Sequence, residues 1–367
     1  MPDRIRSGWA GPLAIIAVIC TLVFTLSSAL GARSSLASGV RSVSHSRTAA
    51  LRPVNLSKLR LPVETGAAKF EVPRPGSGKG LKLGYISLGE QVPFVHLVTL
   101  NIEKEAAIAG ANLKVCDSRE QTDVTLQCAK TFKTQGVQAY LNFQSDSAAS
   151  PSICAAGPSV PVIAIDIHQA PCEKAFMGAN NLYGGLIAGM ALGKYAKQNF
   201  NCKYDSYVSL EEPAAGIVND QRMGGFRRGF QRFCPIHNLL KENAFRVDQA
   251  RTVFADVLTR LTGKHRIFVA GLNDDGVVGA EAAARTAGRV KDLFVGAEGT
   301  DPTAWCQIRK NPQWVADATY FPERYGEIGV PNLIRLAKGQ RVPKLLLVHH
   351  RLVNRANIGK IYKFSCK

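Results

Sequence analysis

Short apolar runs alternate with longer amphipathic stretches from residue 81 to the end of the chain. The run at residues 81–87 has the pattern of a strand, and residues 94–109 place Ile102, Ala106 and Ala109 on one face of a helix. The same alternation predicts further strands at residues 113–116, 139–143, 161–166, 204–210, 245–247, 267–270, 293–296, 314–319 and 345–352. It predicts further helices at residues 124–135, 186–195, 220–233, 249–262, 277–287, 302–310 and 323–338. Because strands and helices that alternate through short loops form parallel sheets covered on both faces, an α/β fold is expected.

Two junctions between a strand and a helix share one plan. A short apolar strand leads into Asn180-Asn181 in the first junction and into Asn273-Asp274 in the second, and a Gly/Ala-rich helix follows each. The Asn can cap the helix, so polar side chains lie at the carboxyl end of a strand, where open α/β sheets bind ligands. The order of elements divides into two similar halves near Asn180. Two Rossmann-like lobes, whose facing strand ends form a cleft, are therefore expected.

The N-terminal region has the pattern of an export signal. Arg4 and Arg6 precede an uncharged run at residues 7–32, which predicts a signal peptide or a signal-anchor over residues 1–32. Cleavage is favoured over anchoring, and both lead to an exported, periplasmic protein, either free or tethered to the inner membrane. Residues 33–80 show no sustained period of 2 or 3.6 and are rich in Ser, Arg, Pro and Gly, which predicts a flexible basic linker.

The chain is strongly basic, with 46 Lys and Arg against 28 Asp and Glu and a formal net charge of +18. Such an excess attracts anionic surfaces, but a solvated basic tail and surface is the favoured explanation. No helix-turn-helix, zinc-finger or aromatic-plus-Arg motif accompanies the charge, so nucleic-acid binding is not expected.

Eight cysteines follow Cys20, an even number in a chain that is expected to be exported. Disulfide bonds are therefore expected among Cys116, Cys128, Cys154, Cys172, Cys202, Cys234, Cys306 and Cys366. A zinc site is the alternative, but no pair has C-x-x-C spacing and no His clusters with the cysteines at ligand spacing. Neither a metal nor a cofactor is expected.

Several short phrases follow one another along the body in a familiar order. They are Pro93-Phe94, Gly178-Ala179-Asn180-Asn181, Arg222 with Gly225-Phe226, Asn273-Asp274, residues 295–300 and the tail at 336–343. In their order and spacing, residues 81–358 resemble the periplasmic solute-binding proteins of the ribose and galactose type, which share their fold with the cores of LacI-like regulators. The resemblance implies the periplasmic binding protein-like I fold: a bilobed clamp that closes on a small ligand and delivers it to an ABC permease.

The resemblance also implies where the chain passes between the lobes. Crossings are expected near residues 179–181, 320–321 and 346–349. The N-terminal lobe would then comprise residues 81–179 and 321–347, and the C-terminal lobe residues 180–320 and 348–367. Since a disulfide between the lobes would lock a hinge that must open, pairing within each lobe is implied, as Cys116–Cys128, Cys154–Cys172, Cys202–Cys234 and Cys306–Cys366.

Carried over residue by residue, the family's ligand site comprises Phe94, Asp166, Asp220, Arg222, Asn273, Glu298 and Tyr320. Planar donors and acceptors suit sugar hydroxyls, and an aromatic face suits the C–H groups of a sugar ring. Simpler roles stay open for three of these residues: Asn273 as a plain helix cap, Asp166 as a loop acid and Phe94 as core packing.

The sequence departs from the family within this site. The family has an Arg directly after Asp166 and another at Asp220, and neither is present, although Arg222 lies two residues on. Glu298 stands for a usual Asp, and Tyr320 for a usual amide. A site that has lost Arg and gained acid favours a polyol, an amino sugar or a cationic solute over an anionic one.

Other functions are less well supported. An enzyme is not expected, because none of the 7 His residues lies in a Ser/His/Asp or metal-binding arrangement. A transcription regulator of this fold would need a DNA-binding headpiece where the export signal stands. A periplasmic sensor that presents its ligand-bound form to a membrane kinase or chemoreceptor is the remaining alternative. We therefore expect a monomer whose partners are a small-molecule ligand and either an ABC permease or a membrane sensor.

Overall fold

The computed structural model describes residues 51–144 and 146–366. The expected signal segment at residues 1–32 and the first part of the expected linker, residues 33–50, lie outside the described residues. These described residues belong to one compact unit. Across the described ranges, we find no helix with the length and apolar character needed to cross a membrane.

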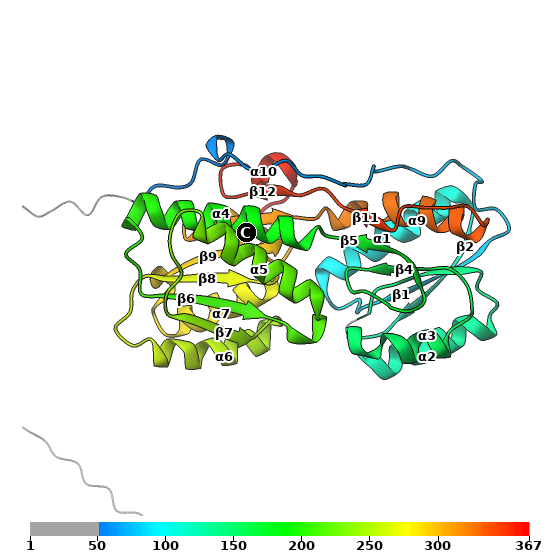
Figure 1. Ribbon diagram of the computed structural model, residues 1–367, viewed down its shortest axis with the longest axis horizontal. Helices are drawn as coiled ribbons and strands as arrows, with labels where there is room; N and C mark the ends of the chain where they lie inside the picture. Colours follow the sequence, from blue (N-terminus) through cyan, green and yellow to red (C-terminus); the bar gives the residue numbers. More distant parts are fainter. Residues whose placement is uncertain (1–50, 145, 367) are drawn as a thin grey trace, which may run out of the picture. The chain divides into compact units, whose positions relative to one another are not determined.

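The first sheet consists of six strands in the order β11-β5-β4-β3-β1-β2 (Figure 1). These strands, all paired in parallel, are β1 (Lys82–Ser87), β2 (Asn112–Asp117), β3 (Ala139–Asn142), β4 (Val162–Ile165), β5 (Glu173–Gly178) and β11 (Leu345–Leu347). Successive side chains of β1 point to opposite faces of the sheet. Leu83 and Tyr85 pack with helices α1 (Pro93–Ala109) and α9 (Gly326–Ala337), whereas Ile86 packs with α2 (Thr122–Thr134) and α3 (Ser150–Ala156). Helices therefore cover both faces.

The second sheet repeats this plan in the order β12-β10-β9-β8-β6-β7. Its strands are β6 (Ser206–Glu211), β7 (Leu239–Asn243), β8 (Ile267–Gly271), β9 (Leu293–Gly299), β10 (Trp314–Thr319) and β12 (Arg351–Val353). All are parallel neighbours except β12, which runs antiparallel to β10. Phe268 of β8 packs with helices α4 (Asn181–Phe200) and α5 (Ile217–Gln231). The next residue, Val269, packs on the other face with α6 (Val247–Arg260), α7 (Asp274–Thr286), α8 (Trp305–Lys310) and α10 (Ile358–Ile361).

Helices α4 and α5 pack closely because glycines face each other where the two helices meet. A Cβ atom at Gly189 would lie 2.1 Å from the carbonyl oxygen of Phe226, and one at Gly229 would lie 2.2 Å from that of Leu186. No side chain larger than hydrogen fits at such distances. The contact holds α5 in a fixed position against α4.

Three crossings join the two sheets, and they confirm the predicted fold of two Rossmann-like α/β lobes with a three-segment hinge. The chain passes between the sheets at residues 179–180, at residues 320–325 (through the 3-10 helix Pro322–Arg324) and at residues 348–350. The third crossing begins two residues later than the resemblance implied. Below, the elements around the first sheet are called the first lobe and those around the second sheet the second lobe. Further short 3-10 helices lie at Leu56–Lys58, Ser147–Ala149, Pro213–Ala215 and Val290–Asp292.

Two predicted strands are wrong in the structure. The strand predicted at residues 345–352 is two strands, β11 and β12, which belong to different sheets. The strand predicted at residues 245–247 does not form; β7 lies earlier, at Leu239–Asn243. As the edge strand of the second sheet, β7 carries Lys, Glu and Asn and is half-exposed, so it lacks the apolar run that marks the central strands.

Residues 51–72, here called the strap, run in extended form along both lobes (Figure 1). On the second lobe, Val54 is buried in the core beside α4, and its carbonyl oxygen accepts a hydrogen bond from the amide of Asn354 at 3.1 Å. The hydroxyl of Tyr183, on α4, donates to the carbonyl oxygen of Pro62 at 3.0 Å. One end of the strap is thus fastened to the second lobe.

The other end of the strap is fastened to the first lobe. Ala67 forms a bridge with Leu347 of β11, and the N–H of Ala68 donates to the carbonyl oxygen of Leu347 at 2.6 Å. Glu71 forms an ion pair with Arg335 of α9 at 2.7 Å. The expected flexible linker is therefore wrong for residues 51–72. The strap shows no period of its own because its side chains pack against two lobes rather than within one element.

The eight cysteines of the described residues lie in four pairs at disulfide distance. These pairs are Cys116–Cys128, Cys154–Cys172, Cys202–Cys234 and Cys306–Cys366, with Cα–Cα distances of 5.8, 5.6, 5.3 and 5.6 Å. Each pair joins segments of one lobe and none bridges the hinge, which is the arrangement that the resemblance implied.

We predict that the purified protein holds these four bonds. Non-reducing digestion followed by mass spectrometry should yield peptides cross-linked within each lobe, because the paired backbones lie at the spacing that a disulfide needs. The same digest after reduction is the control. A peptide that links any of the first four cysteines to any of the last four would contradict the prediction.

Candidate functional site

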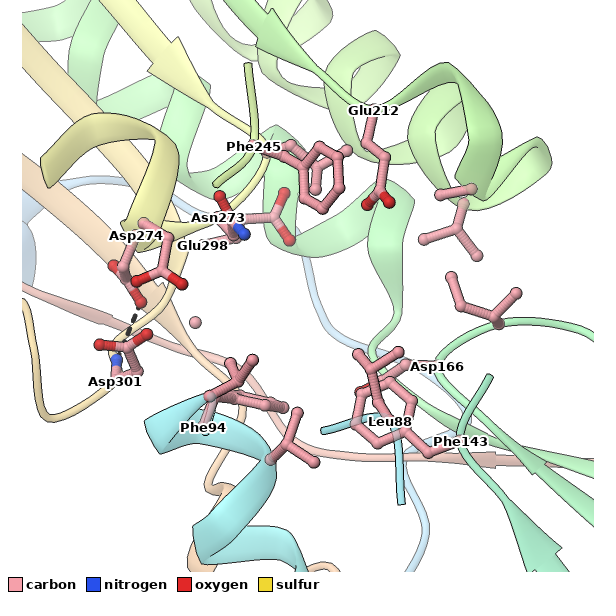
Figure 2. Close-up of a pocket in the computed structure, with 18 of the residues that line it drawn as sticks. Leu88, Phe94, Phe143, Asp166, Glu212, Phe245, Asn273, Asp274, Glu298 and Asp301 are labelled. Atoms are coloured by element: carbon pink, nitrogen blue, oxygen red, sulfur yellow. Dashed lines mark hydrogen bonds between the residues drawn. The ribbon is translucent and has the colours of Figure 1, made fainter. Parts of the chain in front are cut away.

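A cavity lies where the carboxyl ends of the two sheets meet (Figure 2). It encloses about 890 Å³ of space free of protein atoms, part of it open to solvent. Most wall residues lie at or just after the end of a strand or near the start of a helix. The first lobe supplies Leu88, Phe94, Phe143 and Asp166, and the second lobe supplies Glu212, Phe245, Asn273, Asp275 and Glu298, among others. The position agrees with the rule that open α/β sheets bind ligands beyond the carboxyl ends of their strands.

A buried charge network forms the back of the cavity. Arg222 of α5 donates from Nε and Nη2 to the side-chain oxygen of Asn181, at 3.0 and 2.6 Å, and from Nη1 to the carbonyl oxygen of Leu272 at 2.9 Å. Its Nε lies 3.5 Å from Oε2 of Glu298, which also accepts a hydrogen bond from the hydroxyl of Tyr320. The guanidinium is thus held by protein groups and serves as the counter-charge to a buried carboxylate.

The two deepest acids of the cavity share this one cation. Burial, only partly offset by Arg222, raises the pKa of Glu298 to about 8, and Glu298 is fully buried. Burial likewise raises the pKa of Asp166 to about 6, against the opposing effects of Arg222, the N–H of Ala179 and the hydroxyl of Tyr325. One guanidinium therefore does not neutralise both carboxylates fully.

The N-terminus of α7 forms a second acidic wall. Asn273 caps this helix, its side-chain oxygen accepting from the N–H of Gly276 at 3.0 Å, and the residue also lines the cavity. Asp274 Oδ2 accepts from the N–H of Asp301 at 2.8 Å, and burial together with Asp317 and Asp301 raises the pKa of Asp274. Burial, with the neighbouring charge of Asp301, raises the pKa of Asp275 to about 7.

Glu212 forms the edge of the opposite wall. It follows β6 directly, and its carboxylate points into the cavity beside the ring of Phe245 (Figure 2). Burial raises the pKa of Glu212 to about 7, more than Arg222 and Arg246 lower it. Glu212, like Asp275, was not expected from the sequence to line the site.

The structure brings six of the seven expected site residues together. Phe94, Asp166, Arg222, Asn273, Glu298 and Tyr320 all line the cavity. Asp220 does not, because it lies on the exposed side of α5, whereas Arg222 lies on the buried side. The cavity residues that sequence reasoning missed include Glu212 and Phe245; an acid directly after a predicted strand was a signal for Glu212, but Phe245 was assigned to a strand that does not form.

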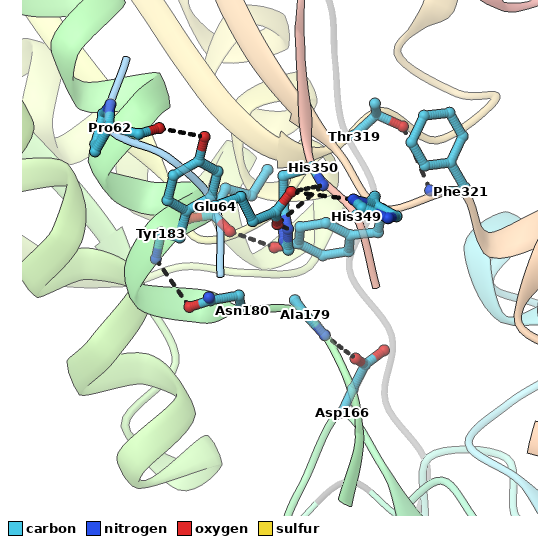
Figure 3. Close-up of polar contacts among 12 residues, drawn as sticks. Pro62, Glu64, Asp166, Ala179, Asn180, Tyr183, Thr319, Phe321, His349 and His350 are labelled. Atoms are coloured by element: carbon cyan, nitrogen blue, oxygen red, sulfur yellow. Dashed lines mark hydrogen bonds and ion pairs between the residues drawn. The ribbon is translucent and has the colours of Figure 1, made fainter. Parts of the chain in front are cut away.

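The hinge lies beside the cavity and is covered by the strap (Figure 3). Glu64 of the strap accepts hydrogen bonds from Nδ1 of His350, at 2.7 Å, and from the backbone N–H of His350, at 3.2 Å. His349 Nδ1 lies 3.4 Å from the same carboxylate. The ring of His350 in turn packs edge-on against Tyr320, with centroids 5.2 Å apart. The strap is therefore in contact with a residue that contacts the wall of the cavity.

Both partners of this contact have shifted pKa values. Burial lowers the pKa of His350, although Glu64 opposes it, so the imidazole is neutral and its Nδ1 carries the proton that Glu64 accepts. Burial alone would raise the pKa of Glu64, but the hydrogen bonds that it accepts from His350 and His349 outweigh this effect and lower that pKa.

Comparisons with known proteins agree with this geometry. Residues 86–341 match the family described as periplasmic binding protein domain. The ribose import binding protein of Salmonella typhimurium is 25% identical over 268 residues, which are 71% of this chain and 86% of that protein. The galactofuranose-binding protein of Escherichia coli is 22% identical over 274 residues, 70% and 86% of the two chains. An ABC transporter solute binding protein from Mycobacterium smegmatis, solved with bound glycerol, superposes with a TM-score of 0.69 at 20% identity, covering 78% of this chain and 98% of that one.

Proposed function

The chain belongs to the periplasmic binding protein domain family, and we propose that it is an exported solute-binding protein that captures a small ligand between its lobes and delivers it to an ABC permease. The family consists of solute-binding proteins rather than enzymes. The observation that carries the proposal is a single cavity walled by strand ends from both lobes, which are joined by hinge crossings. A clamp of this kind holds its ligand by closing around it.

The relatives support a sugar-like or polyol-like ligand. They include proteins named for ribose and galactofuranose, and solved neighbours hold glycerol and myo-inositol. The acidic walls support an amino sugar or another cationic solute equally well. A sugar, a polyol, an amino sugar or a cationic solute is therefore the proposed ligand class.

We assign ligand contact to the expected residues that line the cavity. Phe94 offers an aromatic face from the first lobe. Asn273 uses its side-chain oxygen to cap α7, so its amide N–H groups are the part left to bind a ligand oxygen. The other proposed contacts are Asp166, Arg222, Glu298 and Tyr320.

A thermal-shift screen with sugars, polyols and amines tests the proposal. A ligand that binds the folded clamp should raise the unfolding temperature as its concentration increases, since a ligand concentration of 100 times the dissociation constant stabilises a protein by about 2.7 kcal/mol. Phe94→Ala should weaken this response, and Leu100→Ala, an exposed position on the same helix, should leave it unchanged. A screen without any shift, or a shift that Phe94→Ala leaves intact, would count against a ligand site in this cavity.

A further inference from the structure

The cavity carries far more acid than base. Its acidic lining residues are Glu120, Asp166, Glu212, Asp274, Asp275, Glu298 and Asp301, and its basic lining residues are Arg222 and Arg246. This imbalance is the reverse of the whole chain, which has a formal net charge of +18. The acid is therefore concentrated at the site rather than being a property of the overall composition.

Both arginines are already engaged by the protein. Arg246 forms an ion pair with Glu120, with 3.1 Å between Nε and Oε1. Arg222 is held by Asn181 and the carbonyl oxygen of Leu272, and it faces Glu298. Neither guanidinium is free to neutralise the carboxylates at the front of the cavity.

Two of the acidic lining residues, Glu212 and Asp275, belong to the second lobe: Glu212 follows β6, and Asp275 lies in the first turn of α7. Within the described residues the Glu212 carboxylate makes no hydrogen bond or ion pair, and Asp275 accepts one long hydrogen bond, at 3.4 Å, from the hydroxyl of Thr303. Both residues are half-buried. A carboxylate taken partly out of water is unfavourable unless it is closely paired. Arg222 and Arg246 lower the pKa of Glu212 by less than burial raises it, and no described residue forms an ion pair with either carboxylate.

Aromatic side chains line the cavity with this pair, and the guanidinium of Arg246 lies over the ring of one of them, Phe245, at 4.9 Å from its centroid. Phe245 lies beside Glu212, and Phe94 reaches the cavity from the first lobe. Aromatic faces attract ammonium and guanidinium groups through the negative potential of the ring, and carboxylates attract them through their charge. A neutral polyol would bind such walls by hydrogen bonds but would leave their charge uncompensated.

From this arrangement we infer that the natural ligand carries a positively charged nitrogen, an ammonium or guanidinium, which Glu212 and Asp275 bind beside the aromatic side chains of the cavity. The inference rests on the proposed function and narrows its ligand class. In a clamp that closes on such a ligand, the cation compensates the acid of the second lobe, while Phe94 of the first lobe covers the remainder of the ligand.

Calorimetric titration of the full chain with matched probes tests the inference. The probes are D-glucosamine against D-glucose, D-galactosamine against D-galactose, and putrescine and agmatine as cations without a sugar ring. A cationic probe should bind about tenfold or more tightly than its neutral partner, because one charge-assisted contact suffices for that ratio. Glu212→Gln and Asp275→Asn should each weaken the cationic probe by about tenfold and change neutral binding by less than about twofold.

Asp220→Asn is the matched control, since Asp220 is exposed on α5 outside the cavity. It should leave every affinity unchanged. The Glu212→Gln variant should remain folded, because the Glu212 carboxylate makes no hydrogen bond or ion pair within the described residues and only its backbone N–H is hydrogen-bonded. A normal unfolding temperature for this variant separates a lost binding site from a lost fold.

The pH dependence of binding provides a second readout. Glu212 is influenced by Arg222, Arg246, Glu120 and Asp146, and Asp275 by Asp301, Thr303 and Glu120; the pKa values of both carboxyls are raised to about 7. A cation binds the ionised forms, so its affinity should fall as the pH decreases through about 7. If protonated acids instead donate hydrogen bonds to a neutral ligand, the affinity should rise over the same range.

The outcomes distinguish this inference from the proposed function. If neutral sugars bind as tightly as their amino counterparts, or bind more tightly at low pH, the inference of a cationic ligand is wrong, but the proposed solute-binding function is not contradicted. If no neutral or cationic probe binds, the inference of a cationic ligand is wrong, and the result also counts against the proposed function. Preference for the cationic probes that Glu212→Gln removes and Asp220→Asn retains supports both.

Discussion

Replacing Arg222 with Met is expected to lower the free energy of unfolding by about 3–5 kcal/mol, the range for breaking a buried ion pair by removing one partner. Arg222 is 6% exposed and faces Glu298, which is 0% exposed. Its positive charge also offsets the burial of Asp166. Without it, Asp166 and Glu298 lose the cation that opposes the rise of their pKa values, so their ionised forms become costlier still, and Asn181 loses its hydrogen-bond donors.

Urea unfolding of the purified protein measures this effect. Arg228→Met is the matched control, because Arg228 is an exposed arginine on the same helix and its loss should change stability by no more than about 0.5 kcal/mol. Adding Glu298→Gln to Arg222→Met should restore part of the loss, since it removes one of the uncompensated charges. If Arg222→Met proved as mild as Arg228→Met, the guanidinium would not be the counter-charge of this cavity.

Removing the carboxylate of the strap by Glu64→Ala is expected to cost about 1–3 kcal/mol, the usual cost of leaving buried donors without an acceptor. The side chain of His350 is 0% exposed, and both its Nδ1 and its backbone N–H donate to Glu64. Glu71→Ala is the matched control within the same strap. Its partner Arg335 is 36% exposed, so the pair should contribute about 1 kcal/mol or less. Equal effects of the two variants in urea unfolding would contradict a special role for Glu64.

The same contact makes the hinge sensitive to acid. Because burial lowers the pKa of His350 in the folded state, the unfolded chain binds a proton below about pH 6.5 that the folded chain does not, and stability falls as the pH falls. Glu64 acts in the same direction at lower pH, since its pKa is lowered in the folded state and its contribution is lost once it is protonated there. Unfolding measured from about pH 7 to pH 5 should show a steeper loss for the parent than for His350→Gln.

The central strands and the junctions between strands and helices could be predicted from the sequence because their signals are local. An apolar run followed by a capping Asn marks the end of β8 and the start of α7 without reference to any other part of the chain. The edge strand β7 has no such run, since one of its sides meets solvent. The run at 345–352 is continuous in sequence but crosses from one sheet to the other, and a pattern along the chain cannot show to which sheet each residue belongs.

The sequence indicated candidate site residues near the starts of helices, but it did not show which of them face the cavity. Asp220 and Arg222 lie two residues apart on α5, so they point to different sides of the helix. The spacing alone therefore does not decide which of them faces the cavity, and the structure selects Arg222. Phe245 could not be predicted as a site residue, because it lies in the loop after β7, where the sequence pattern predicted a strand that does not form. The strap was missed for a different reason: its contacts with Leu347 and His350 are more than 270 residues away along the chain.

The strap determines on which lobe the N-terminal end of the described chain lies. With three hinge crossings, a chain that starts on one lobe ends on the other; the strap adds a fourth passage, so residues 52 and 366 both lie on the second lobe, through Asn199 and Cys306. A tag fused ahead of the strap and a tag fused behind residue 366 would therefore both be attached to the second lobe. A surface attachment through either one would hold the second lobe and leave the first lobe free.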